Sequence, residues 1–122
     1  MKLRIKANSL RIRLTKTQVR KLAETGYLEA QTSFPNNRFV YALQKQADAT
    51  ELSAIFENNK ITMLAPATFI TDWPVNNVVG LETKMQLPNN EFLFLLIEKD
   101  FVCLDETTED QRDNYENPNK NC

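Results

Sequence analysis

The chain has 122 residues, of which 42% are hydrophobic and 25% charged, and its formal net charge is −1. These totals are typical of one globular domain, and no stretch has the roughly 18 consecutive apolar residues of a membrane-spanning helix, so no membrane insertion is expected. The chain contains no histidine, which excludes Ser-His and Cys-His nucleophile pairs and the histidine-containing zinc sites.

The first residues and the cysteines indicate the compartment. Residues 1–6 alternate basic and apolar side chains with no continuous apolar segment behind them, unlike a secretory signal. The two cysteines, Cys103 and Cys122, lack the spacing of a disulfide framework. We therefore expect a cytoplasmic protein with reduced thiols.

Charge is unevenly distributed along the chain. Residues 1–45 contain ten Lys or Arg and two acids, whereas residues 46–122 contain five Lys or Arg and fourteen acids. Two interpretations are open: the two parts neutralise each other across one fold, or the basic part forms a surface that binds anions.

The chain opens with a predicted hairpin. Residues 2–7 and 10–14 each alternate apolar with basic side chains, and Asn8-Ser9 between them is typical of a turn. Because successive side chains of a strand point to opposite faces, all the cations of this hairpin would lie on one face.

A helix and a second hairpin follow. The helix is expected to begin after Thr15, because Gln18 completes a capping box, and to end at Gly26, which suits a C-terminal cap. Residues 27–34 and 38–44 are predicted to be strands on either side of a Pro-Asn-Asn turn.

The second half of the chain repeats this order. A short helix is predicted between Pro66 and Pro74, since proline is favoured at the start of a helix and disfavours its continuation. The four predicted strands around this helix span residues 51–57, 60–64, 80–87 and 91–97. Within the last of them, residues 92–97 are six consecutive apolar residues, which predicts a central strand with both faces covered.

The order strand-strand-helix-strand-strand therefore occurs twice. Residues 29–45 align with residues 82–98 without a gap, and six of the seventeen aligned pairs are identical. We interpret the chain as an internal duplication with units 1–45 and 51–98, together forming one compact domain of residues 1–104.

Two such units define the expected fold. It is an α+β fold with about eight mostly antiparallel strands and two helices, closed as a barrel or bent strongly, because either unit alone would leave sheet edges and an apolar face uncovered. An eight-stranded barrel has an interior wide enough for side chains or one small ligand.

Both ends of the chain carry a distinctive pattern. The chain begins with Met-Lys-x-Arg-Ile-Lys-x-Asn-Ser-x-Arg-x-Arg-Leu-Thr, and near its end Glu98-Lys99-Asp100-Phe101-x-Cys103-Leu104 precedes Glu109-Asp110, Asp113-Asn114 and Asn117-Pro118. These patterns resemble an uncharacterised family of short bacterial proteins, a domain of unknown function, over essentially the whole chain. The family often has glycine in place of Ala7. It has no activity to carry over, so the resemblance implies kinship only.

Residues 105–122 form an acidic, polar tail. Eleven of them are Asp, Glu, Asn or Gln, and Tyr115 is the one aromatic residue. This composition is typical of a disordered or loosely attached segment. The family resemblance instead implies that the tail belongs to the domain, where the basic hairpin is the simplest surface for it to pack against.

The candidate ligand-binding residues belong to the basic hairpin: they are Lys6, Arg4, Arg11 and Arg13. Arginines on one face of a sheet can hold phosphate or carboxylate by paired hydrogen bonds. Inside a barrel they would be similar to the tunnels of triphosphate-processing enzymes, although the Glu-x-Glu-x-Lys pattern of those enzymes is absent. The alternative is an outward, solvated face. The pI near 5.5 and the lack of interleaved aromatic residues disfavour nucleic acid.

Two further sites are candidates. Glu98 and Asp100, with the acids that follow, could hold a divalent cation such as Mg²⁺ or Ca²⁺ through oxygen ligands, although the spacing fits no calcium loop; the alternative is a solvating acidic segment. Cys103 is a candidate functional thiol if a Lys or Arg lies beside it, and otherwise a small buried hydrophobe. No other cofactor is predicted.

The residues leave three functional hypotheses open. The first is a non-enzymatic domain that binds a small anion or a partner protein through the basic hairpin. The second is a metal-assisted hydrolase of phosphate esters or triphosphates. The third is a structural or oligomerising module.

Overall fold

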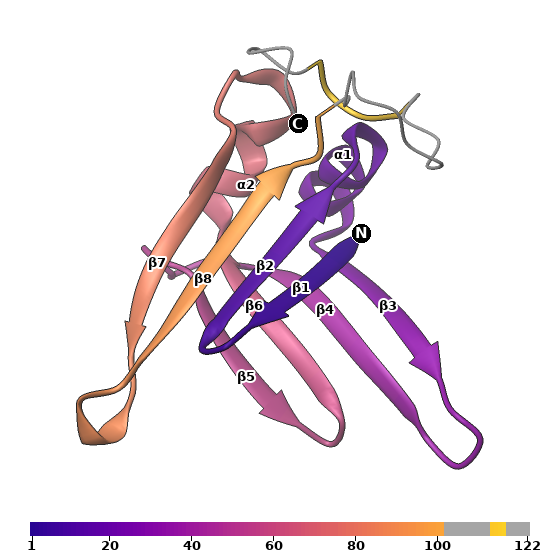
Figure 1. Ribbon diagram of the computed structural model, residues 1–122. Coiled ribbons are helices and arrows are strands. Elements are labelled where there is room, and N and C mark those ends of the chain that lie inside the picture. Colours follow the sequence, from indigo (N-terminus) through magenta and orange to yellow (C-terminus); the bar gives the residue numbers. More distant parts are fainter. Residues whose placement is uncertain (102–112, 117–122) are drawn as a thin grey trace.

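The computed structural model describes residues 1–101 and 113–116, which contain two α-helices and eight strands (Figure 1). The strands are β1 (Lys2–Lys6), β2 (Ser9–Leu14), β3 (Tyr27–Ser33), β4 (Arg38–Gln46), β5 (Ser53–Glu57), β6 (Lys60–Pro66), β7 (Gly80–Gln86) and β8 (Phe92–Lys99). The helices are α1 (Lys16–Thr25), α2 (Ala67–Asp72) and the 3-10 turns η1 (Trp73–Val75) and η2 (Pro88–Asn90). Neither α-helix among these residues has the length and apolar character needed to cross a bilayer.

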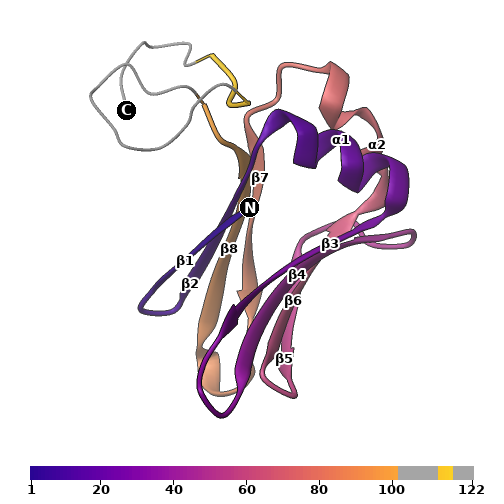
Figure 2. The same cartoon turned by 90° about the vertical axis from the view of Figure 1, so that its right-hand side faces the viewer.

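The strands form two four-stranded sheets that lie face to face (Figure 2). Sheet A has the order β1-β2-β8-β7 and sheet B the order β3-β4-β6-β5. Each sheet consists of two antiparallel hairpins that lie side by side. Their inner strands pair with each other in parallel, β2 with β8 in sheet A and β4 with β6 in sheet B. The prediction of mostly antiparallel strands is confirmed, whereas the parallel central pairs were not predicted.

The prediction of a closed barrel is wrong. No strand pairing joins sheet A to sheet B within the described residues. The physical reason is that stacking already buries the apolar faces: the inward side chains of the two sheets meet in one core, so the edges need not pair. Fully buried members of this core include Ile12, Leu14, Leu43, Met63 and Ile97.

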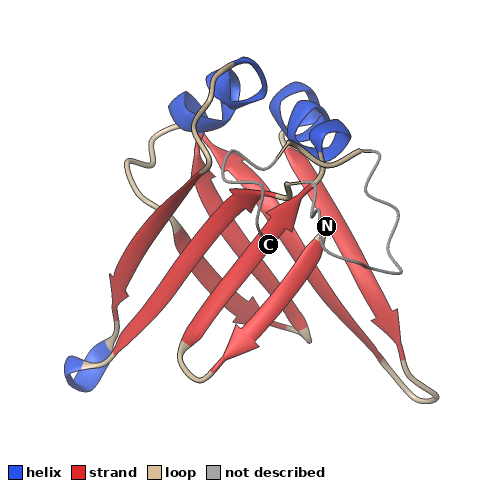
Figure 3. Ribbon diagram, turned by 45° about the horizontal axis from the view of Figure 1, so that its top comes forward, coloured by secondary structure: helices blue, strands red, loops and turns tan. Residues whose placement is uncertain are grey.

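The two helices cover one end of the sandwich (Figure 3). Val19 and Leu22 of α1 and Ile70 of α2 are fully buried there, together with Trp73 of η1. The rings of Phe69 and Trp73 are 5.0 Å apart, which extends the apolar contact along α2. Helix packing rather than edge pairing therefore closes this end.

The predicted caps of α1 are confirmed. The hydroxyl of Thr15 accepts a hydrogen bond from the backbone of Gln18, and the Gln18 side chain accepts one from the backbone of Thr15. Gly26 takes a left-handed conformation with φ of +81°, which glycine adopts without a steric penalty. At the second helix Pro74 does not end the helical path at once, because it lies within η1.

The apolar run of residues 92–97 forms β8, which is a central strand as predicted. The expectation that both of its faces are covered is wrong. Leu95 and Ile97 are buried between the sheets, whereas Phe94 points outward and keeps 51% of its surface exposed. This apolar run thus has one face on the core and one on the surface, because no described element packs on the outside of sheet A at this position.

Candidate functional site

The outer face of sheet A carries the cations of the β1–β2 hairpin. Leu10, Ile12 and Leu14 point into the core, so the alternating residues of β2 point away from it. The register places Arg4 beside Arg11 across the two strands. The face predicted from alternation is therefore real, and it points outward rather than into an enclosed interior.

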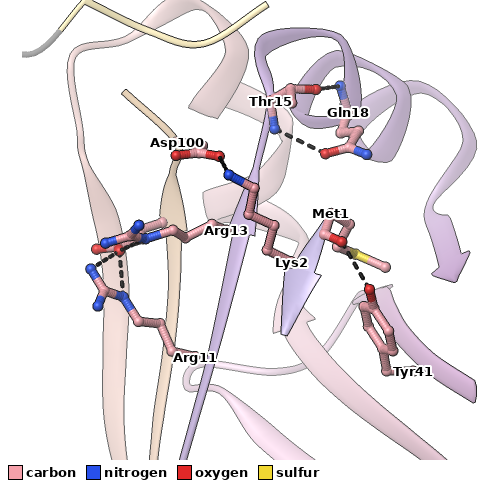
Figure 4. A network of polar contacts seen from close by, with 9 residues as sticks. Met1, Lys2, Arg11, Arg13, Thr15, Gln18, Tyr41 and Asp100 are labelled. Carbon is pink, nitrogen blue, oxygen red and sulfur yellow. Dashed lines mark hydrogen bonds and ion pairs between the residues drawn. The ribbon is translucent and has the colours of Figure 1, made fainter. Parts of the chain in front are cut away.

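Two of the four predicted ligand-binding residues are ion-paired with a predicted metal ligand. Arg11 and Arg13 both contact Oε1 of Glu98, and the Arg13 Nε distance is 2.8 Å (Figure 4). The carboxylate is 14% exposed, so the two guanidinium groups compensate a largely desolvated charge. Glu98 is positioned for this because β8 runs parallel to β2, with Arg13 as its neighbour in register.

The second predicted metal ligand, Asp100, also has a cationic partner. Its Oδ2 is 3.0 Å from Nζ of Lys2, as Figure 4 shows. In residues 1–101 and 113–116, no three metal-ligating side chains lie close enough together to hold an ion. The structure therefore brings Glu98 and Asp100 to the basic hairpin as counter-charges.

Arg4 and Lys6 differ from these residues because neither has a charged or hydrogen-bonding side-chain partner within the described part of the chain. They line a hollow of about 200 Å³ with Ser9 and Arg11. This hollow is the part of the predicted site whose cations are available to an external anion.

A larger groove of about 570 Å³ continues from this hollow across β2, β8 and β7. Its lining includes the apolar residues Phe94 and Leu96 and the charged residues Arg11, Glu82 and Lys84. The Lys84 ammonium lies 5.8 Å from the centre of the Phe94 ring. Sequence reasoning missed this groove, since an aromatic residue comes beside the basic hairpin only through the parallel pairing of β2 with β8.

The described part of the tail contacts the N-terminus of α1. The Asp113 carboxylate accepts hydrogen bonds from the backbone and the hydroxyl of Thr17, and its backbone carbonyl accepts one from Lys16. Desolvation alone would raise the pKa of Asp113, but hydrogen bonds from Thr15 and Thr17 and the charge of Lys16 outweigh it and lower that pKa. Cys103, with the rest of residues 102–112 and 117–122, lies outside the described residues, so its prediction stays untested, as does packing of the tail on the basic hairpin.

A second cavity, of about 510 Å³, lies where α1, η1 and the end of β8 meet the 113–116 segment. Lys99 lines it and is only 4% exposed, and burial lowers the pKa of its ammonium. Burial also raises the pKa of the Tyr115 phenol, and its buried hydroxyl has no hydrogen-bond partner among residues 1–101 and 113–116. Sequence analysis did not single out this region.

Comparison with protein-family models matches residues 1–119 to a family of unknown function, DUF7009. The chain belongs to this family. The resemblance inferred from the two terminal patterns is thereby confirmed as membership of an uncharacterised family. No match was found among curated proteins or among solved structures.

DUF7009 membership assigns no role to any residue. The evidence for the function of this DUF7009 chain therefore comes from its charged and apolar surface residues. The hydrolase and oligomerisation hypotheses stay predictions, and no contact described above favours either. A tunnel of the triphosphate-processing kind is disfavoured, because the hairpin cations lie on the outer face and the space between the sheets is filled by apolar side chains.

Proposed function

We propose that this protein is a non-enzymatic binding module whose outer face of sheet A takes an acidic segment of a partner protein. The observation that carries the proposal is the pair Arg4 and Lys6, whose charges have no partner among the described residues and which border an open hollow. Guanidinium and ammonium groups on an exposed face attract carboxylates and fix them by charge-assisted hydrogen bonds.

The shape of the surface favours an extended peptide over a small anion. The basic hollow shares Ser9 and Arg11 with the apolar groove, so the two form one continuous path across the sheet. An exposed Phe94 in the groove offers the aromatic anchor typical of protein interfaces. Glu82 and Glu98 interrupt the positive charge, which disfavours a nucleic-acid backbone.

We also propose that the fold arose by internal duplication, with β1-β2-α1-β3-β4 as one unit and β5-β6-α2-β7-β8 as the other. Exchanging the two units converts the order of sheet A into that of sheet B. The parallel contacts agree as well: Ser9 beside Phe94 in sheet A corresponds to Lys60 beside Val40 in sheet B.

The helices support the same correspondence. Counting from the caps Thr15 and Pro66, Val19 of α1 takes the place of Ile70 in α2, and Leu22 takes the place of Trp73. All four of these apolar side chains are fully buried. Equivalent burial at equivalent positions is what two copies of one unit would retain.

The part of the gapless sequence alignment that follows the long turn disagrees with the strand pairing. Leu28 pairs with Leu43 in the first long hairpin, and Leu81 pairs with Ile97 in the second. Leu43 therefore corresponds to Ile97, whereas the gapless alignment matches it to Leu96. The second turn is one residue longer, and a shift by one residue moves every following side chain to the other face. The identities after the turn consequently join positions on opposite faces.

The duplication bears on function because it supplies an internal control. At the positions that correspond to Arg4 and Lys6, sheet B carries Ile55 and Glu57. Arg11 corresponds in the same way to Thr62. The fold thus forms an equivalent sheet without these cations, so their presence on sheet A is not a requirement of folding.

Binding to the outer face is tested with labelled peptides. The probe is a fluorescent peptide of alternating Glu and Phe residues, and its binding is measured by fluorescence anisotropy. A Lys/Phe peptide and single-stranded RNA serve as comparisons. The double variant Arg4→Gln/Lys6→Gln and the variant Phe94→Ala should each weaken binding of the acidic peptide about tenfold, whereas Lys21→Gln, which removes an exposed cation on α1, should leave it unchanged. Equal loss with Lys21→Gln, or tighter binding of RNA than of the peptide, would contradict the proposal.

The duplication has a test of its own. In an experimental structure, residues 1–45 should superpose on residues 52–99 once two extra residues are allowed between the helix and β7 and one in the second long turn. Failure of Ser9 and Lys60 to occupy equivalent positions in that superposition would refute the duplication and leave the binding proposal to its own experiment.

A further inference from the structure

The second cavity, at the helical end of the sandwich, is separate from the outer face of sheet A. We propose that it binds the oxyanion of a small organic ligand, a carboxylate or a phosphate monoester that carries a small apolar group. The residues that would contact the oxyanion are Lys16 and Arg20 of α1, Lys99 at the end of β8, and Tyr115.

The charge of the lining is strongly biased. Three cations, Lys16, Arg20 and Lys99, face the cavity, and Glu116 is the one acid among the described residues that line it. The nearby Asp113 carboxylate is engaged by Thr17. Three converging cations opposed by one exposed carboxylate create a positive potential that favours an anion.

Two buried polar groups have unused hydrogen-bonding capacity. Within the described part of the chain, the Tyr115 hydroxyl is buried and has no hydrogen-bond partner, although buried polar atoms almost always have one. The Lys99 ammonium donates to the carbonyl of Asn76 at 2.7 Å, and an ammonium has three N–H donors. The Lys99 Nζ lies 4.7 Å from the centre of the Tyr115 ring, so the ammonium and the aromatic ring are in cation–π contact.

The hydrogen bond from Lys99 to a backbone carbonyl has a structural role in the fold, whereas the buried Tyr115 hydroxyl is not explained by it. Lys45, at the corresponding end of β4, also donates to a carbonyl near a helix end, that of Ala23 at 3.1 Å. A lysine at this place is therefore part of the fold in both halves. The buried Tyr115 hydroxyl has no comparable acceptor or donor among the residues that the structure describes.

The remaining lining consists of the polar residues Asn76 and Asn77 and four apolar residues. Pro74, Val75, Val79 and Phe101 surround the cations, and Val75 is 88% exposed. A volume of about 510 Å³ lies within the range of small-molecule sites, which combine apolar walls with a few convergent polar groups. These walls favour an organic anion over an inorganic one.

The test is a titration of the full chain with phenyl phosphate and with benzoate. Binding is measured by calorimetry and by the fluorescence of Trp73, the one tryptophan. We expect saturable binding at one site for at least one probe, and at least tenfold weaker binding of phenol, which lacks the oxyanion. Arg20→Gln should weaken binding about tenfold and Tyr115→Phe about fivefold, as expected for loss of a charged and of a neutral hydrogen bond.

Two matched variants make the result specific. Lys21→Gln removes an exposed cation next to Arg20 on the same helix, and Arg4→Gln removes one from the outer face of sheet A; both should bind the probes like the wild type. The thermal midpoint of Tyr115→Phe should equal or exceed that of the wild type, because an unpaired buried hydroxyl is removed.

The proposal is overturned if neither probe binds saturably at millimolar concentration, if phenol binds as well as phenyl phosphate, or if Lys21→Gln weakens binding as much as Arg20→Gln. Loss of probe binding in Arg4→Gln alone would place the anion on the outer face. That result would refute the pocket while leaving the function proposed for sheet A intact.

Discussion

Asp100 and Lys2 form an ion pair, 3.0 Å between Oδ2 and Nζ, that connects the residue after the last strand to the first strand. The Asp100 side chain is 8% exposed and that of Lys2 47%. The backbone of Asp100 also donates to the carbonyl of Leu14 and accepts from the amide of Tyr115, each at 2.8 Å. One buried residue thus joins β1, β2 and the 113–116 segment.

We expect this pair to be coupled energetically. Lys2→Met should lower the free energy of unfolding by about 1–2 kcal/mol, because it leaves a buried carboxylate without its cation. Adding Asp100→Asn should recover part of that loss, with a coupling energy of about 1 kcal/mol in a double-mutant cycle measured by urea unfolding. Arg4→Met, on the same strand, should change stability by less than about 0.5 kcal/mol. Strict additivity of the two changes would show that the pair contributes nothing.

Gly80 cannot carry a side chain in this sheet. A Cβ at this position would collide with the backbone carbonyl of Ile97 and lie 2.9 Å from Cβ of Glu98. Gly80→Ala should therefore cost about 1–3 kcal/mol, the usual range for overpacking, measured as a lowered urea midpoint. Since Gly80 faces Glu98 across the strand pair, displacement of Glu98 should also disturb its pairing with Arg11. An alanine variant as stable as the wild type would contradict this reading of the contact.

Ala7 lies in the β1–β2 turn with φ of +46°, a conformation that favours glycine. Ala7→Gly should raise the free energy of unfolding by up to about 1 kcal/mol, because relief of the left-handed strain of about 1–2 kcal/mol exceeds the entropic cost of glycine. Thermal and urea unfolding both measure the change. Ala47→Gly is the matched control: it is also an exposed turn residue, but its φ is not positive, so it should lower stability slightly.

Asp113 should stabilise the start of α1 in a pH-dependent manner. Asp113→Ala removes the acceptor for the Thr17 amide and should cost about 1 kcal/mol near pH 7, as for other helix N-terminal acceptors. The folded-state pKa of Asp113 is lowered, so its contribution is fully present above the unfolded pKa, about 3.9, and is lost as pH falls through the folded pKa.

The measurement is the difference in unfolding free energy between the wild type and Asp113→Ala across the acid range. That difference should stay constant down to about pH 5 and shrink at lower pH. Asp72→Ala, at the last residue of α2, serves as a control that removes one carboxylate elsewhere. A difference that grows as the pH falls would mean that the carboxylate opposes folding.

Local features of the chain could be predicted from the sequence because their causes lie within a few residues. Alternation defined the strands, the Thr15 and Gln18 pair defined the start of α1, and Gly26 defined its end. The outward cations of the first hairpin followed from the same alternation, since Leu10, Ile12 and Leu14 had to be buried. Membership of an uncharacterised family was also predicted from the sequence, and the match over residues 1–119 confirms it.

The tertiary structure alone decided which strands are neighbours. The parallel pairing of β2 with β8 joins residues far apart in the chain, and no local pattern encodes that choice. It brings Glu98 to Arg11 and Arg13 and exposes Phe94 beside them. The row of cations thereby becomes a mixed surface, on which Arg4 and Lys6 have no charged partner among the described residues. The separation into two sheets has the same origin, because two stacked faces bury the apolar side chains that a barrel would otherwise have enclosed.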